Sequence, residues 1–135
     1  MIRLRKYIRN NRGQSMVEFA LVLPLLLLIL GGLIDFGRVF NQSMIVTAAA
    51  REGARAAAVG ESASVAANAA AAAKAYAAAI DQGGLQVSVN PTAPASGDRM
   101  TVTVTNPVTI YFPGMAVFFP SNPYTVRGVA TMRKE

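Results

Sequence analysis

The feature that most constrains this chain is an apolar run close to its N-terminus. Sixteen residues from Phe19 to Ile34 carry no charge, and thirteen of them are strongly apolar. A helix that begins near Ser15 and ends with this run has about twenty residues and a length of roughly 30 Å, which matches the hydrocarbon thickness of a bilayer. The run therefore predicts a membrane-spanning helix over residues 14–34.

Basic residues precede the run and indicate its orientation. Five of the first twelve residues are Arg or Lys and none is acidic, whereas the chain after position 12 carries eight basic and seven acidic residues. The positive-inside bias places the N-terminus in the cytoplasm and residues 35–135 outside. Because this remainder is nearly neutral and has no visible basic face, we expect no nucleic-acid partner.

The chain contains no cysteine and no histidine. Their absence removes disulfides, thiolate chemistry, the commonest metal ligands and the usual general base. Asp and Glu are thinly scattered and form no paired-carboxylate motif. We therefore expect no catalytic, cofactor or metal site, and a protein that is not an enzyme.

A conventional secretory signal shares the basic start and the apolar run. Here the run is followed by Asp-Phe-Gly-Arg-Val-Phe, with no small-x-small cleavage site close behind it. Cleavage directly after the apolar run is therefore the weaker interpretation.

Two alanine-rich segments follow the predicted span. Residues 35–59 lack proline and favour helix, so we expect the membrane helix to continue outside the lipid up to Gly60. Residues 62–82 predict a second helix packed against the first. Small residues recur at four-residue spacing in the first segment, in the rows Ala49, Gly53, Ala57 and Ala50, Ala54, Ala58. These rows either allow close approach of another helix or only reflect the helix preference of alanine.

After Gly84 the apolar period changes from that of a helix to that of a strand. Alternating apolar residues predict strands over residues 85–90, 99–105 and 124–132, with a turn-rich linker between the first two. The predicted fold is α+β and pilin-like: a long N-terminal membrane-spanning helix, a second alanine-rich helix and a small three-stranded antiparallel sheet.

An apolar, proline-rich segment separates the second and third predicted strands. Its four prolines, of which Pro107 is the first, oppose regular structure. Its four aromatic residues are Tyr111, Phe112, Phe118 and Phe119. They are explained either by burial in the core or by an apolar contact with a neighbouring subunit or the membrane surface.

The junction before the apolar run resembles the processing site of pilin precursors. A membrane peptidase cuts these precursors on the cytoplasmic side after a glycine, and the fifth residue of the mature chain is usually glutamate. In this sequence Gly13 is followed by Gln14, and Glu18 stands at the fifth place. Phe19 follows, and the Glu-Phe pair resembles that of Flp and Tad (tight adherence) pilins.

Two longer blocks narrow the resemblance to the TadE-like family of small pseudopilins. They read RGQSMVEFALVLPLLLLILGGLIDFGRVF and AAAREGARAAAVG, and the closing VATMRKE resembles the last strand of that family. The resemblance implies a minor subunit of a Tad-type type IV pilus, with residues 1–13 as a cleaved leader. It implies other pilins, prepilin peptidase, the pilus assembly platform and membrane lipid as partners, and the bacterial inner membrane as the location before assembly into an extracellular pilus.

Glu18 has two compatible interpretations. Ser15 and Glu18 form an S-x-x-E capping box that satisfies amides at a helix N-terminus. Alternatively, cleavage after Gly13 creates an ammonium group at Gln14, and Glu18 of a staggered neighbour offsets the cost of burying it. N-methylation of Gln14 is in question because other type IV pilins have a hydrophobic first residue, and an N-terminal glutamine can instead cyclise.

Further charged residues are candidate subunit contacts. Asp35 and Arg38 form either a solvated helical pair at the membrane boundary or a contact with a neighbour. The other three candidates are Arg51, Glu52 and Arg55, which can bridge either to a neighbour or to the sheet of the same chain. An uncleaved, single-pass anchored binding module is the alternative function from a different class.

Overall fold

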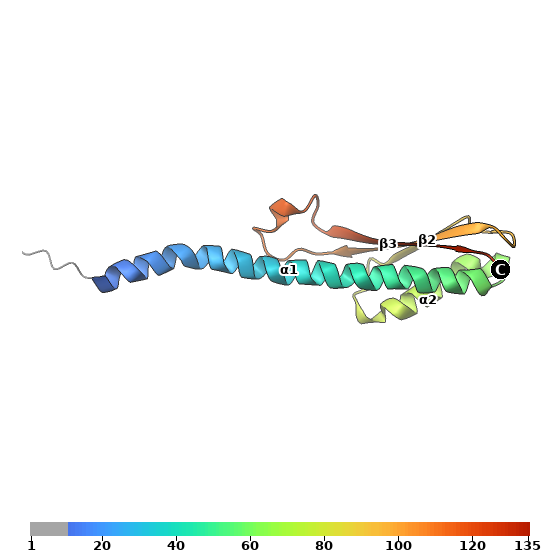
Figure 1. Cartoon of the computed structure of the whole chain (residues 1–135), viewed down its shortest axis with the longest axis horizontal. Helices are drawn as coiled ribbons and strands as arrows, with labels where there is room; N and C mark the ends of the chain where they lie inside the picture. Colours follow the sequence, from blue (N-terminus) through green and yellow to red (C-terminus); the bar gives the residue numbers. More distant parts are fainter. Residues whose placement is uncertain (1–10) are drawn as a thin grey trace, which may run out of the picture.

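The computed structural model describes residues 11–135, which form a long helix, a short second helix and a three-stranded antiparallel sheet (Figure 1). The elements are α1 (Asn11–Val59), α2 (Val65–Tyr76), β1 (Gln86–Asn90), β2 (Arg99–Val108) and β3 (Tyr124–Arg133), with short 3-10 helices η1 (Ser62–Ser64), η2 (Ala77–Ala79) and η3 (Ala116–Phe118). The predicted α+β class is confirmed.

Helix α1 is continuous from Asn11 to Val59 and therefore starts before Ser15, where we expected it to begin. Residues 1–10 of the predicted leader lie outside the described residues. Pro24 lies inside α1, and the N-terminal part of the helix bends relative to the rest (Figure 1). A proline inside a helix removes one backbone hydrogen bond and commonly bends the axis, which accounts for this shape.

The sheet has the order β1-β2-β3, and both strand pairs are antiparallel. The central strand β2 continues to Val108, three residues further than predicted, and includes Pro107. The pairing of β1 with β2 stops at Thr105, whereas Pro107 pairs with Thr125 of β3. One side of β2 is therefore an edge at Pro107, where a missing N–H is tolerated.

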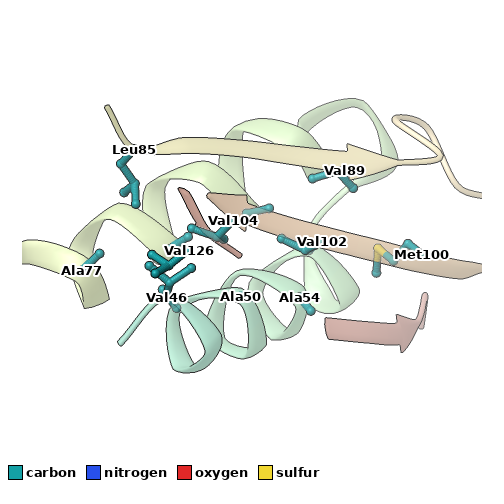
Figure 2. Packing of buried hydrophobic residues seen from close by; sticks show 14 of the residues in the cluster. Val46, Ala50, Ala54, Ala77, Leu85, Val89, Met100, Val102, Val104 and Val126 are labelled. Carbon is teal, nitrogen blue, oxygen red and sulfur yellow. The ribbon is translucent and has the colours of Figure 1, made fainter. Parts of the chain in front are cut away.

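The core lies between the sheet and the C-terminal half of α1. Met100, Val102 and Val104 are fully buried on one face of β2, as the alternation predicted. Figure 2 shows these side chains together with Val46 and the small residues of α1. The apolar face of the sheet thus covers one side of the helix, and burial of this surface is the main stabilising contribution.

Helix α2 returns along α1 and packs through its small residues (Figure 1). At Gly53 of α1, an added Cβ would lie 3.0 Å from the Ala69 carbonyl oxygen and 3.3 Å from the Ala73 Cβ. The rows of small residues therefore allow close approach of a helix from the same chain.

The second helix is shorter than the predicted span of residues 62–82. Its last turn tightens into the 3-10 helix η2, and the Gln82 side chain donates a hydrogen bond of 2.9 Å to the Lys74 carbonyl. Carbonyl groups at a helix end need such partners, which the periodicity of alanine does not reveal.

Strand β3 joins the sheet to the C-terminal half of α1. The backbone of Gly128 abuts Val46, so that an added Cβ would overlap the Val46 carbonyl. Lys134 is buried, and its Nζ donates hydrogen bonds to the carbonyls of Ala58, at 3.1 Å, and Gly60. A cation at this position satisfies the carbonyl groups at the C-terminus of α1 and interacts favourably with the helix dipole.

Candidate functional site

The N-terminal part of α1 extends beyond the sheet and exposes apolar side chains on every side. Nearly all large apolar residues from Met16 to Ile34 are exposed in the chain. Within residues 11–135, α1 is the one helix long and apolar enough to cross a membrane; its most apolar window has a mean hydropathy of 2.6 and is 6% buried. A helix that is apolar all round requires apolar surroundings, which this chain does not supply.

The predicted processing site lies in the first turn of α1. Gly13 is exposed and helical, and nothing lies within 4 Å of an added Cβ. Gln14, Val17 and Glu18 lie on the same side of the helix as Gly13 and line one shallow hollow with it. This spacing places Glu18 one helical turn from the residue that cleavage would make the new terminus.

Glu18 and Phe19 are both exposed. Within residues 11–135 the Glu18 carboxylate makes no hydrogen bond or ion pair. Because α1 begins at Asn11, Ser15 does not occupy the N-cap position that a capping box requires. The structure therefore leaves the carboxylate available to a group outside this part of the chain.

Asp35 differs most from the sequence-based expectation of a solvated pair. Its residue surface is 2% exposed. One carboxylate oxygen accepts a hydrogen bond of 2.8 Å from the backbone N–H of Phe112, and the other accepts one of 3.3 Å from that of Tyr111. Arg38 lies 3.5 Å away, in an ion pair with Asp35. Asp35 is thus an internal acceptor that anchors a distant segment of its own chain.

Residues 109–123, here called the proline-rich loop, are the segment that Asp35 anchors. Arg38 also contacts this loop: its Nη1 donates a hydrogen bond of 3.2 Å to the Thr109 carbonyl, and its guanidinium lies 4.4 Å from the centre of the Tyr111 ring. Together, Asp35 and Arg38 fasten the loop to α1 at the end of the predicted span.

The aromatic residues of the proline-rich loop were explained either by burial in the core or by an apolar contact outside the chain, and the structure divides them between these two interpretations. Phe112 and Phe119 are half-buried, and Phe119 contacts the Tyr124 ring at a centroid distance of 5.2 Å. Tyr111 and Phe118 are exposed. Core burial therefore explains Phe119 alone, since Phe119 packs against the core cluster whereas the Phe112 ring lies against Gly31 of the apolar run.

The remaining candidate residues lie on the outer face of α1. Arg51, Glu52 and Arg55 are all exposed. The Asp35–Arg38 pair is the single salt bridge found within the described part of the chain, so these three residues do not bridge to the sheet of the same chain. No group of three or more potential metal ligands occurs among residues 11–135.

Sequence reasoning missed the contact between the proline-rich loop and the span. Its signal was the Gly31-Gly32 pair: an added Cβ at Gly31 would overlap the Phe112 ring, and one at Gly32 would lie 2.7 Å from the Met115 sulfur. A glycine pair inside an apolar run marks a close approach of this kind.

Comparison with known proteins finds a family match for the N-terminal part of the chain. Residues 13–55, about a third of the sequence, match the model of a family described as TadE-like protein. The resemblance recognised in the sequence is thereby confirmed over the first of its two long blocks and part of the second. No curated protein and no solved structure is significantly similar to this chain.

Proposed function

Because residues 13–55 match the TadE-like family, we propose that this pilin-like chain is a minor pilin, or pseudopilin, of a Tad-type type IV pilus. The observation that carries the proposal is the exposed, all-round apolar half of α1, preceded by the Gly13 junction. In the membrane, lipid covers this half; in an assembled pilus, the same half packs against the helices of other pilins.

Processing by prepilin peptidase after Gly13 is the first step of this function. The glycine is exposed and has open space around it. Glycine in a helix costs about 1 kcal/mol relative to alanine, which favours the unwinding that an extended substrate needs. The product would begin at Gln14 and keep α1 as its membrane anchor, with the sheet domain outside the inner membrane.

Glu18 supplies the contact for assembly. Its carboxylate has no partner among the described residues, and it shares a face of α1 with Gln14. In a bundle of apolar helices an unpaired ammonium is costly, and a carboxylate from a staggered neighbour offsets that cost. The pair would also fix the axial register between subunits. Methylation or cyclisation of Gln14 would modify or remove the ammonium.

Mass spectrometry of the protein from its native membrane tests the processing step. We expect a chain that starts at Gln14. Gly13→Leu should block the cut, whereas Gly37→Leu, at another α1 glycine with open space around it, should leave it unchanged. An intact N-terminus in cells with active prepilin peptidase contradicts the proposal and favours the uncleaved anchored binding module.

A charge-neutral variant tests the assembly step separately. Glu18→Gln should preserve insertion and cleavage but reduce co-purification with the other pilins. Glu61→Gln is the matched control, because Glu61 is also exposed but lies at the far end of α1. If Glu18→Gln assembled normally, the proposed pairing of Glu18 with the N-terminal ammonium would be contradicted. The proposal that the chain is cut after Gly13 would not be affected.

A further inference from the structure

We propose that the proline-rich loop, residues 109–123, is a second membrane contact that inserts Val117 and Phe118 into the outer surface of the bilayer. The inference rests on the spanning role of α1 in the proposed function and adds a lipid-binding surface formed by the sheet domain. It follows from the position of the loop, its exposed side chains and the way its polar groups are satisfied.

The loop lies against the last turns of the apolar run. Phe112 and Met115 cover Gly31 and Gly32, and an added Cβ at Gly114 would lie 3.1 Å from the Leu28 side chain. Residues 28–35 correspond to about 10 Å of helix. The loop therefore flanks the outer end of the span, whereas the rest of the sheet domain packs further along α1 (Figure 1).

The loop exposes large apolar and aromatic side chains and carries no charge. Val117 is 84% exposed, Phe118 is 73% exposed and Tyr111 is 71% exposed. No charged residue occurs between Arg99 and Arg127. Phe118 and Met115 also line an apolar hollow of about 340 Å³ together with side chains of the span. The exposed patch on the loop thus continues into the surface of α1 that lipid covers.

The two charges at this depth are both held by the loop. Asp35 is buried beneath it, and the Arg38 side chain, which is 37% exposed, has its guanidinium over the Tyr111 ring. Phe36 and Phe40, on either side of Arg38 in the sequence, are exposed and stack at a centroid distance of 6.3 Å. The apolar band therefore extends past Asp35. Exposed aromatic residues at its end are typical of the boundary between lipid and water.

The loop also satisfies many of its own backbone groups. The N–H of Ile110 donates to the Asn122 side chain, and the next two donate to Asp35. The N–H groups of Met115 and Phe118 donate to loop carbonyls, and three prolines have no N–H. Irregular backbone is costly near hydrocarbon unless its polar groups have such partners. The loop thus fits a shallow position at the membrane surface.

Single-tryptophan variants test the inference, because the natural chain contains no tryptophan. The full chain is reconstituted at low protein density into phosphatidylcholine–phosphatidylglycerol vesicles that carry brominated acyl chains. Phe118→Trp reports on the loop, Leu26→Trp on the span and Tyr76→Trp on α2; all three positions are exposed in the fold.

We expect Phe118→Trp to emit at shorter wavelength than Tyr76→Trp and to be quenched most by bromine close to the head groups. Leu26→Trp should be quenched most by bromine deep in the acyl chains, and Tyr76→Trp should not be quenched. Quenching at position 26 without quenching at 118 overturns the loop contact alone. Absence of quenching at both positions overturns the contact and the spanning helix together. A third outcome is emission at position 118 that is blue-shifted but not quenched, with a blue shift that is lost when the protein density in the vesicles is lowered. This result would show that a second copy of the chain covers Phe118, and it also overturns the proposal.

Discussion

Helix α1 is one continuous element whose two halves lie in opposite environments. From Met16 to Ile34 its large apolar side chains point outward on all sides. From Val46 to Ala58 one face consists mainly of alanine and glycine and is buried under α2 and the sheet. The backbone is the same in both halves, so side-chain size decides what covers each of them. Small residues let other elements of the same chain approach closely, whereas the large residues from Met16 to Ile34 stay uncovered by this chain.

This comparison leads to opposite expectations for mutations in the two halves. In the covered half, single changes should alter the stability of the folded domain. In the uncovered half, they should alter only what the helix does with its surroundings. All four of the following tests use the isolated chain in detergent micelles, so that no neighbouring subunit contributes.

The largest effect is expected where β3 abuts α1. Gly128→Val should destabilise the domain by at least about 3 kcal/mol, because the added side chain overlaps the Val46 carbonyl and forces the sheet away from the helix. Denaturant unfolding followed by circular dichroism measures the loss. Gly37→Val, at a position with open space, should change stability by less than about 0.5 kcal/mol. Equal effects of the two variants would contradict the described close approach.

Asp35→Ala tests the contact that anchors the proline-rich loop at the boundary between the two halves of α1. This change leaves the N–H groups of Tyr111 and Phe112 without their acceptor and should cost about 2–3 kcal/mol. Asp35→Asn keeps one acceptor oxygen and should lose less. Hydrogen exchange should accelerate at residues 111 and 112 in Asp35→Ala but remain slow in the centre of β2. Unchanged exchange at both amides would show that Asp35 does not anchor the loop.

A smaller effect is expected at the C-terminal end of α1. Lys134→Met keeps most of the apolar stem of the side chain but removes the donor to the Ala58 and Gly60 carbonyls. We expect a loss of about 1–2 kcal/mol, measured as a lower denaturant midpoint. Lys74→Met is the control, since Lys74 is exposed on α2, and it should leave the midpoint nearly unchanged.

The smallest effect is expected in the uncovered half. Leu26→Ala removes a large side chain that is exposed in the chain, so the free energy of unfolding of the sheet domain should change by less than about 0.5 kcal/mol. Val46→Ala, in the covered half, should cost about 2 kcal/mol. If both variants lost the same amount, the two halves of α1 would not differ in the way described.

Much of the architecture was predictable because it depends on local periodicity. The apolar run indicated the exposed half of α1, alanine density indicated a second helix, and alternation indicated the buried face of β2, including Met100 and Val104. The TadE-like resemblance depended on two blocks in the first half of the chain, where the family model also matches, and on the closing VATMRKE, which lies outside the matched residues.

The interpretations that failed depend on contacts between residues far apart in the sequence. Asp35 looks like a boundary charge because the nearby Gly31-Gly32 pair indicates a close approach but not that the amides of residues 111 and 112 are the groups that reach Asp35. Pro107 looks like a strand terminator because the sequence does not show that β1 ends its pairing before that position. The claims about Gly13 and Glu18 remain predictions, because their proposed partners are other molecules.

The position of β3 also determines the order in which the molecule can be completed. Its contacts with α1 and β2 form only after residues 124–134 have been synthesised, long after the apolar run has left the ribosome. Until then the alanine-rich face of α1 has no sheet to cover it, and the carbonyls of Ala58 and Gly60 lack Lys134. The domain therefore cannot close around α1 until its last strand has been made.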